Sequence, residues 1–253
     1  MAKSEYIPCI LSVTTIPERV EHFFSAIDCF LSQSVKPEKM IVWLCENYFS
    51  EADIEKIRIK FALPAWIELK RVIHLGPHTR VFYAVKKFPD YPIVVADDDM
   101  IFPIFWLENL LKKFKNEPEY IHAYYTKTIS FDKNLALKPQ HEWLSDIHEP
   151  SHFHHLLLGV GTIFPPGSFH KDALDLEKIK ALAPTSSDTW FTVMAILKGT
   201  KVKKMFPESQ IFPIIPGTQK KSMWQINSKT IDKQIREIYD YYKIKELLFK
   251  QEV

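Results

Sequence analysis

Glycine is scarce in this sequence, with 6 residues in 253, while proline is common with 17. This balance predicts well-defined loops rather than flexible linkers. Neither sign of charge is in excess, because 33 Lys and Arg residues face 31 Asp and Glu residues, for a net charge of +2. A nearly neutral chain has no general attraction for nucleic acid, so we expect no nucleic-acid partner. The 46% hydrophobic and 25% charged content is typical of a globular protein.

Long hydrophobic runs are also missing. No stretch reaches about 18 consecutive apolar residues, so no membrane span is expected, although peripheral association stays open. The first six residues lack the apolar core of a signal peptide. The three cysteines, Cys9, Cys29 and Cys45, are scattered in apolar segments without zinc spacing. They indicate buried thiols in a reducing compartment, and we expect a cytoplasmic protein.

The first half of the sequence alternates short apolar runs with amphipathic stretches. Strands are predicted at 7–13, 40–45, 67–73 and 93–97. Helices are predicted from Pro17 to Leu31, from a capping box at Ser50 and Asp53 to Phe61, and from Arg80 to Lys87. Strands that alternate with helices predict a mostly parallel sheet flanked by helices. We therefore expect an α/β, nucleotide-fold-like unit from residue 7 to about 114.

The second half is less regular. β-type residues occupy 120–131, a polar loop 132–151, and an apolar stretch 156–164 in which Gly159 and Gly161 indicate a bend or a close approach to a ligand. A helix is predicted from Asp188 to Gly199, a strand over 201–206, and one amphipathic helix over 229–249.

Three consecutive aspartates, Asp97, Asp98 and Asp99, follow the apolar run Ile93–Ala96. Such a run is typical of a strand buried on both faces, and ligands of open α/β sheets bind outside the carboxyl ends of strands. Adjacent carboxylates repel one another, and a divalent cation would relieve this repulsion. In extended backbone Asp97 and Asp99 would share one side and Asp98 would point away. A solvated acidic turn is the alternative interpretation.

Several segments together resemble glycosyltransferases of the GT-A fold, and in particular a group of bacterial sugar transferases. They read Ser12-Val-Thr-Thr-Ile-Pro-Glu-Arg19, Gly76-Pro-His-Thr-Arg80, Asp97-Asp-Asp-Met100 with Trp106-Leu107, Gly161-Thr-Ile-Phe-Pro-Pro-Gly167 and Ser187-Asp-Thr-Trp190. The resemblance implies one GT-A domain over 1–253. Its nucleotide-binding half would be 7–114, and its acceptor-binding half, 115–253, would end in the C-terminal helix.

The resemblance also implies an activity and a cofactor. It implies transfer of a sugar from a nucleotide-diphosphate sugar to a glycan or other hydroxyl acceptor, in the synthesis of bacterial surface polysaccharide or another glycan. The Asp-x-Asp motif would hold Mn²⁺ or Mg²⁺, which stabilises the departing diphosphate. Asp99 would be the metal carboxylate, Asp97 would contact the ribose or metal-bound water, and Asp98 would be their neighbour.

Four other residues acquire roles from the resemblance. Thr14, Thr15 and Arg19 would meet the nucleoside, although Thr15 could instead cap the helix that starts near Pro17. Arg80 stands where the relatives usually have Lys and would contact a phosphate as a fork rather than as a point charge. Its alternative is a solvated helix residue.

Asp188 is the candidate general base, which would take the proton of the acceptor hydroxyl. The relatives tend to have two acidic residues here, whereas this sequence has Ser187 at the first position. An Asp at a helix start could also be only a cap. Trp190 would either form a wall for the sugar or pack in the core.

Other polar groups and other functions remain alternatives. His148, His152, His154 and His155 could ligate a metal, but they lie in loop-like sequence. Lys220 and Lys221 would either meet the diphosphate or form a solvated pair. A nucleotidyltransferase also uses carboxylate-bound metal, yet it typically has a glycine-rich phosphate loop, and 12–19 contains no glycine. A non-catalytic sugar- or nucleotide-binding module could dispense with Asp188.

Overall fold

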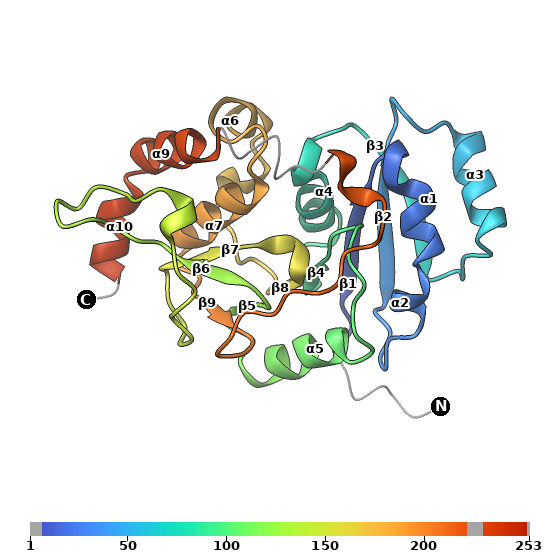
Figure 1. Ribbon diagram of the computed structural model, residues 1–253, viewed down its shortest axis with the longest axis horizontal. Coiled ribbons are helices and arrows are strands. Elements are labelled where there is room, and N and C mark those ends of the chain that lie inside the picture. Colours follow the sequence, from blue (N-terminus) through green and yellow to red (C-terminus); the bar gives the residue numbers. More distant parts are fainter. Residues whose placement is uncertain (1–6, 222–229, 252–253) are drawn as a thin grey trace.

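The computed structural model describes residues 7–221 and 230–251 and shows an α/β fold built on one large sheet (Figure 1). The sheet has seven strands in the order β3-β2-β1-β4-β8-β5-β9. All neighbouring pairs are parallel except those of β8, which is antiparallel to β4 and β5. Its strands are β1 (Ile10–Thr15), β2 (Lys39–Cys45), β3 (Ile67–Val72), β4 (Ile93–Val95), β5 (Ile121–Ala123), β8 (Thr162–Phe164) and β9 (Val202–Lys204). The expected fold class, a mostly parallel sheet flanked by helices, is confirmed.

The central strands are mostly apolar because the sheet is covered on both faces. Alternate residues of β1 and β2 belong to two separate hydrophobic cores. Ile10, Ile41 and Trp43 face one core, while Leu11, Met40 and Val42 face the other. The β1–β2 register, which sets Leu11 opposite Met40 and Val13 opposite Val42, keeps each set on its own face.

Helices cover the two faces in two groups. The core containing Trp43 receives side chains from α4 (Thr79–Lys87), α6 (Leu176–Leu182) and α7 (Ser187–Lys198). The opposite core receives them from α1 (Pro17–Ser25), α2 (Asp28–Leu31), α3 (Glu51–Lys60) and α5 (Trp106–Asn116). Ser50 and Asp53 form the predicted capping box of α3.

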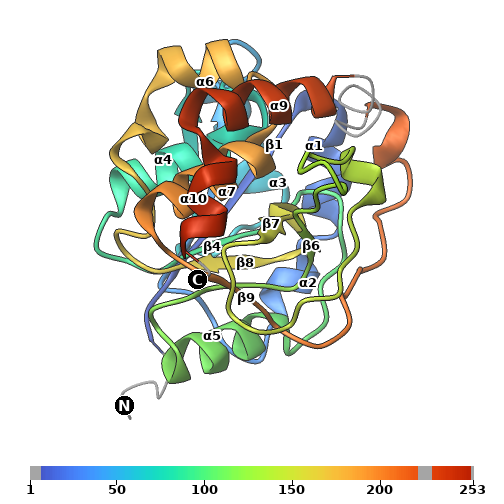
Figure 2. The same cartoon turned by 90° about the vertical axis from the view of Figure 1, so that its left-hand side faces the viewer.

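A smaller antiparallel sheet, β6 (Thr126–Thr128) and β7 (His154–Leu156), lies beside the main one. Helices α9 (Ile231–Tyr242) and α10 (Ile244–Gln251) pack on the same side of the molecule (Figure 2). Short 3-10 turns occupy Gly76–His78, Gln140–Glu142, Leu158–Val160, Lys171–Leu174 and Thr218–Lys221. No described helix is long and apolar enough to cross a bilayer.

Two helices predicted as continuous are each broken. The stretch from Pro17 to Leu31 forms α1 and α2, which are separated at Ala26, and the turn lets Phe23 and Phe30 pack with ring centroids 6.1 Å apart. The terminal helix ends at Lys243, which is left-handed with φ 52°, and resumes as α10. The bend allows Ile238 and Leu248 to be buried in one core. Helices α5 and α6 were not predicted, and residue 229 lies outside the described residues.

Candidate active site

The aspartate triplet lies at the carboxyl end of β4, next to the carboxyl end of β1. The backbone N–H of Asp97 donates to Gly159 O at 2.9 Å, and the chain then turns through Asp98 and Asp99. The prediction that Asp98 would point away from its neighbours was wrong, because the turn brings Asp98 and Asp99 onto one cation. Both are buried, at 5% and 8% exposed, which rules out the solvated acidic turn.

That cation is Arg19, which extends from α1. Its Nη1 lies 2.8 Å from Asp98 Oδ1 and 3.0 Å from Asp99 Oδ2. Its Nε donates to the carbonyl of Thr218 at 3.1 Å. Arg19 therefore ties two carboxylates to the segment that follows Pro213. Burial raises the pKa of Asp98, and the charge of Arg19 opposes that rise.

Arg80 binds the third carboxylate. It lies in the first turn of α4, is only 7% exposed, and donates through Nη1 to Asp97 Oδ1. The turn before it is fixed by Thr79, whose Oγ1 donates to Gly76 O at 2.8 Å while Gly76 adopts φ 55°. Buried Ser12 of β1 also donates to Arg80 O at 2.5 Å. Burial excludes the alternative of a solvated helix residue.

Gly159 makes room for the Asp97 side chain. A Cβ at this position would lie 1.7 Å from Asp97 Oδ2, which is far inside van der Waals contact. The sequence marked Gly159 as a bend or a ligand approach, but the structure shows that its backbone approaches an aspartate of the same chain. Gly159 and Asp97 are far apart in the sequence, so no local pattern predicts this contact.

Asp99 is also held by residues 215 and 219, which belong to no motif recognised in the sequence. Its Oδ2 accepts from Gln219 Nε2 at 3.0 Å, and its backbone O accepts from Ile215 N at 2.7 Å. Burial, together with the charge of Asp97, raises the pKa of Asp99 to about 6, although Arg19 acts in the opposite sense. Asp99 is therefore held by Arg19 and Gln219 and repelled by Asp97.

Asp188 lies in the same charged cluster although it comes from α7. The Leu158 backbone and the Ser187 side chain lie near its carboxylate and lower its pKa. The Asp188 side chain is only partly exposed, and this desolvation raises its pKa to about 6. The Arg80 charge lowers that pKa, and the Asp97 charge raises it. Ser186 is the N-cap residue of α7, so Asp188 is not the cap, but it lies in the first turn of the helix, where its charge suits the helix dipole.

Thr14 and Thr15, at the end of β1, have side chains in different surroundings. Thr14 Oγ1 donates to Trp43 O at 3.1 Å, within the sheet. The buried hydroxyl of Thr15 lies beside Asp98 and lowers its pKa, without a hydrogen bond of normal geometry. Thr15 does not cap α1, because Ile16 is the N-cap residue and no side chain caps that helix. Thr15 therefore belongs to the environment of the triplet.

Trp190, His154 and His155, which the sequence also suggested as functional, make contacts outside the aspartate cluster. Trp190 is fully buried and donates to Ala173 O at 3.1 Å, so it packs in the core and forms no sugar wall. His154 contacts Thr126 Oγ1 at 2.9 Å and Glu149 O at 2.9 Å. His155 lies 3.1 Å from the Gln140 side chain. The side chains of residues 220 and 221 lie outside what the structure describes.

The triplet fits a divalent cation only with help from a ligand. Within residues 7–221 and 230–251, no three His, Cys, Asp or Glu side chains are arranged to hold a metal ion. However, Mg²⁺-type ions are commonly held by one or two carboxylates plus substrate phosphate oxygens. Three carboxylates face two guanidinium groups here, which leaves one negative charge, and ionised Asp188 adds a second. A cation bound jointly by Asp97, Asp99 and a diphosphate suits this balance.

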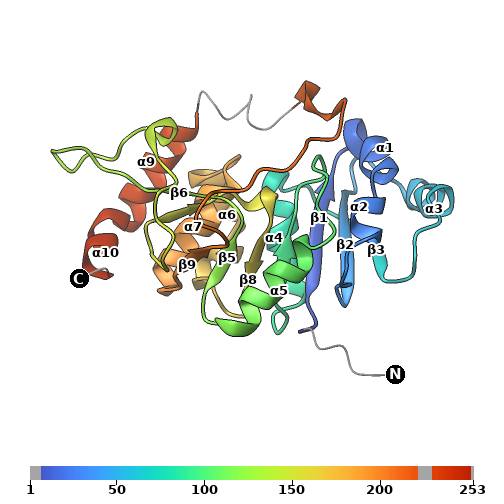
Figure 3. The same cartoon turned by 60° about the horizontal axis from the view of Figure 1, so that its bottom comes forward.

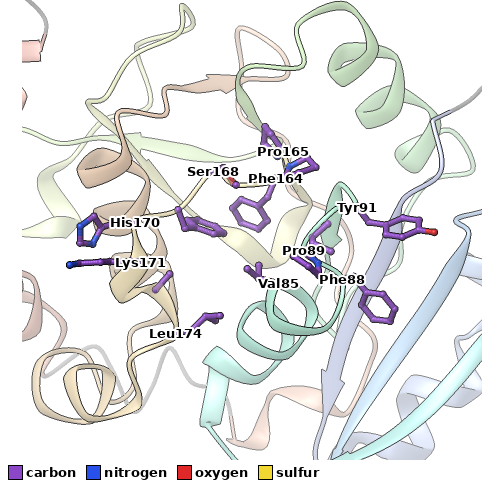
Figure 4. Close-up of a pocket in the computed structure, with 15 residues that line it drawn as sticks. Val85, Phe88, Pro89, Tyr91, Phe164, Pro165, Ser168, His170, Lys171 and Leu174 are labelled. Carbon is purple, nitrogen blue, oxygen red and sulfur yellow. The ribbon is translucent and has the colours of Figure 1, made fainter.

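One cavity is lined by residues of α4 and of the segment that follows β8 (Figure 4). It measures about 190 Å³ and is lined mainly by apolar side chains, among them Val85, Phe88, Phe164 and Leu174. Ile93, at the start of β4, lines this cavity, whereas the aspartates follow the end of that strand. Charge and hydrogen bonding, rather than cavity size, therefore identify the candidate active site.

Comparisons with known proteins show one weak structural similarity and no related family. No family model and no curated protein matches the chain. Among solved structures, the chain is similar to one described as the crystal structure of 4-diphosphocytidyl-2C-methyl-D-erythritol synthase. The TM-score is 0.40 and the sequence identity 12%, over 69% of this chain and 85% of that chain. A similarity this weak supports no statement about activity.

Proposed function

We propose that this protein is a metal-dependent glycosyltransferase of the GT-A type, which moves a sugar from a nucleotide-diphosphate sugar to a hydroxyl acceptor. One observation carries the proposal. Asp97, Asp98 and Asp99, two arginines and a carboxylate from a distant helix converge at the carboxyl ends of β1 and β4. Ligands of open α/β sheets bind at this edge.

The donor is bound through the diphosphate and the ion pairs around it. Asp97 and Asp99 would hold Mn²⁺ or Mg²⁺, which supplies positive charge to the leaving diphosphate. Arg80 and Arg19 are fixed donors next to those carboxylates and contribute further positive charge. Thr14 and Thr15 close β1 beside the triplet, at the position proposed for the nucleoside.

Asp188 is the general base of the proposed reaction. It accepts the proton of the acceptor hydroxyl as that oxygen attacks the anomeric carbon, and the sugar–phosphate bond breaks. A base whose pKa lies near 6 is mostly ionised at neutral pH and still basic enough to accept a proton. Arg80 lowers the pKa of Asp188 and so keeps the base ionised.

The experiment is incubation of the protein with a panel of nucleotide sugars and Mn²⁺, without and with candidate acceptors. Release of a nucleoside diphosphate, increased by acceptor, supports the proposal. In a parallel incubation with a nucleoside triphosphate and a sugar phosphate, release of pyrophosphate would instead indicate a nucleotidyltransferase. Tight nucleotide binding without turnover of any donor would indicate a binding module.

A further inference from the structure

A short sequence occurs twice, and the two copies lie side by side. Ile-Phe-Pro-Ile is found at 101–104, directly after the triplet, and again at 211–214. Ile101 N donates to Pro213 O at 2.8 Å, and Met100 and Ile214 form an antiparallel bridge. Figure 3 shows the chain before α5 running beside the segment that follows β9. We call residues 100–105 with 211–216 the apolar ribbon.

The ribbon is anchored on one side and exposed on the other. Phe102 and Phe212 face inward, with ring centroids 5.6 Å apart. The outward side chains are 40% to 67% exposed, and they are Ile101, Ile104, Phe105, Ile211 and Ile214. No charged residue occurs in 100–107 or 209–218. Contiguous exposed apolar area of this kind marks an interaction site.

The size of the patch argues against a protein partner. Five half-exposed large side chains present on the order of 400–500 Å². Each partner in a stable interface contributes about 800 Å², and its rim is polar. The ribbon has about half that area and no charged side chain, so it fits a narrow, uncharged, flexible ligand such as a hydrocarbon chain.

The ribbon is continuous with the candidate active site. Met100 follows Asp99 directly, and Ile215 N donates to Asp99 O at 2.7 Å. One end of the ribbon therefore borders the candidate active site, and a ligand whose polar end enters that site would lay an attached chain on the ribbon. We propose that the apolar ribbon binds the hydrocarbon chain of an amphipathic, lipid-bearing acceptor. This inference rests on the proposed function for the polar end of that ligand.

The test uses alkyl glucosides as monomers, from methyl through hexyl to octyl, because only the chain changes along this series. Binding is followed in the full protein by ¹³C signals of isoleucine δ1-methyl groups. Signals of Ile101, Ile104, Ile211 and Ile214 should shift saturably, and affinity should rise about two- to fourfold per added CH₂. Ile59 and Ile73, which are 70% and 60% exposed elsewhere, should not shift.

Variants provide a matched control. Ile104→Ser should weaken octyl glucoside binding, whereas Ile59→Ser should leave it unchanged. Equal shifts at Ile59 and Ile73, or no dependence on chain length, would overturn the inference. So would binding to phosphatidylglycerol vesicles without monomer binding, which would indicate a membrane surface, and so would dimers in sedimentation, which would indicate a second copy. Because the probe contains no nucleotide, failure of the donor experiment would not produce any of these results.

Discussion

At the residue scale, Asp188 is partly exposed, and its charged neighbours Arg80 and Asp97 shift its pKa in opposite directions. If it is the base, Asp188→Asn should lower kcat by about 10²- to 10⁴-fold. Donor affinity should change little. In the unaltered protein, kcat/KM should rise with pH through about 6 as Asp188 ionises. Initial rates over a pH series for both proteins provide the measurement.

A stability measurement on the same variant separates the base from a purely structural residue. The pKa of Asp188 is raised in the folded protein, so the stability present when it is protonated is lost as pH rises through about 6. Asp188→Asn should therefore unfold at a higher denaturant concentration than the unaltered protein at about pH 8, and not at about pH 4. Near-normal turnover in this variant would remove Asp188 from the reaction.

Arg80 is predicted to bind the diphosphate in addition to forming its ion pair with Asp97. Arg80→Ala should weaken binding of nucleoside diphosphates about 10- to 100-fold, the range for charge-assisted hydrogen bonds, while nucleoside binding stays the same. Arg80→Lys should recover part of the loss, because charge returns without the guanidinium fork. Calorimetric titration compares the three proteins. Equal weakening for nucleoside and diphosphate would assign Arg80 to the base or ribose instead.

At the element scale, the turn that carries Gly159 controls where Asp97 lies. Gly159→Ala should displace the carboxylate, since its Cβ would lie 1.7 Å from Asp97 Oδ2. We expect a stability loss of about 1–3 kcal/mol, as for overpacking, and a loss of metal-dependent nucleotide binding. Thermal unfolding and nucleotide titration measure the two effects.

Gly167→Ala is the matched control for that substitution. Gly167 has φ 71°, and a Cβ added there would meet no atom within 4 Å, so its replacement strains the backbone away from the site. It should lower stability and leave nucleotide binding as it was. Normal metal-dependent nucleotide binding by Gly159→Ala would show that the position of Asp97 does not matter.

The elements that the sequence predicts well are those with strong local patterns. The strands containing Leu11, Met40 and Val94 are apolar on both faces and were found, as was the α3 capping box. The breaks at Ala26 and Lys243 were not, because they serve packing between distant segments rather than local preference.

The same distinction holds in the candidate site. The triplet, Arg80 and Asp188 are visible as motifs, and the fold brings them together. The contacts of Gln219 with Asp99 and of Gly159 with Asp97 join residues 120 and 62 positions apart, and no local pattern specifies them.

At the scale of the whole molecule, a nearly neutral chain concentrates carboxylates at one sheet edge. The three aspartates of the triplet and Asp188 outnumber the two arginines, and burial with mutual repulsion raises the pKa of Asp99 to about 6. Protonation should therefore compete with a cation, so metal-dependent binding should weaken as pH falls below about 6. The excess negative charge is the physical basis for expecting a metal ion together with a diphosphate.

Calorimetric titration of a nucleoside diphosphate at about pH 7.5, with Mn²⁺ and with chelator, tests this claim most directly. We predict that Mn²⁺ alone binds weakly and that it tightens diphosphate binding by at least about tenfold, because phosphate oxygens must complete the coordination shell. Asp99→Asn should abolish the Mn²⁺ effect without unfolding the protein. Equal diphosphate affinity in Mn²⁺ and in chelator would contradict the account.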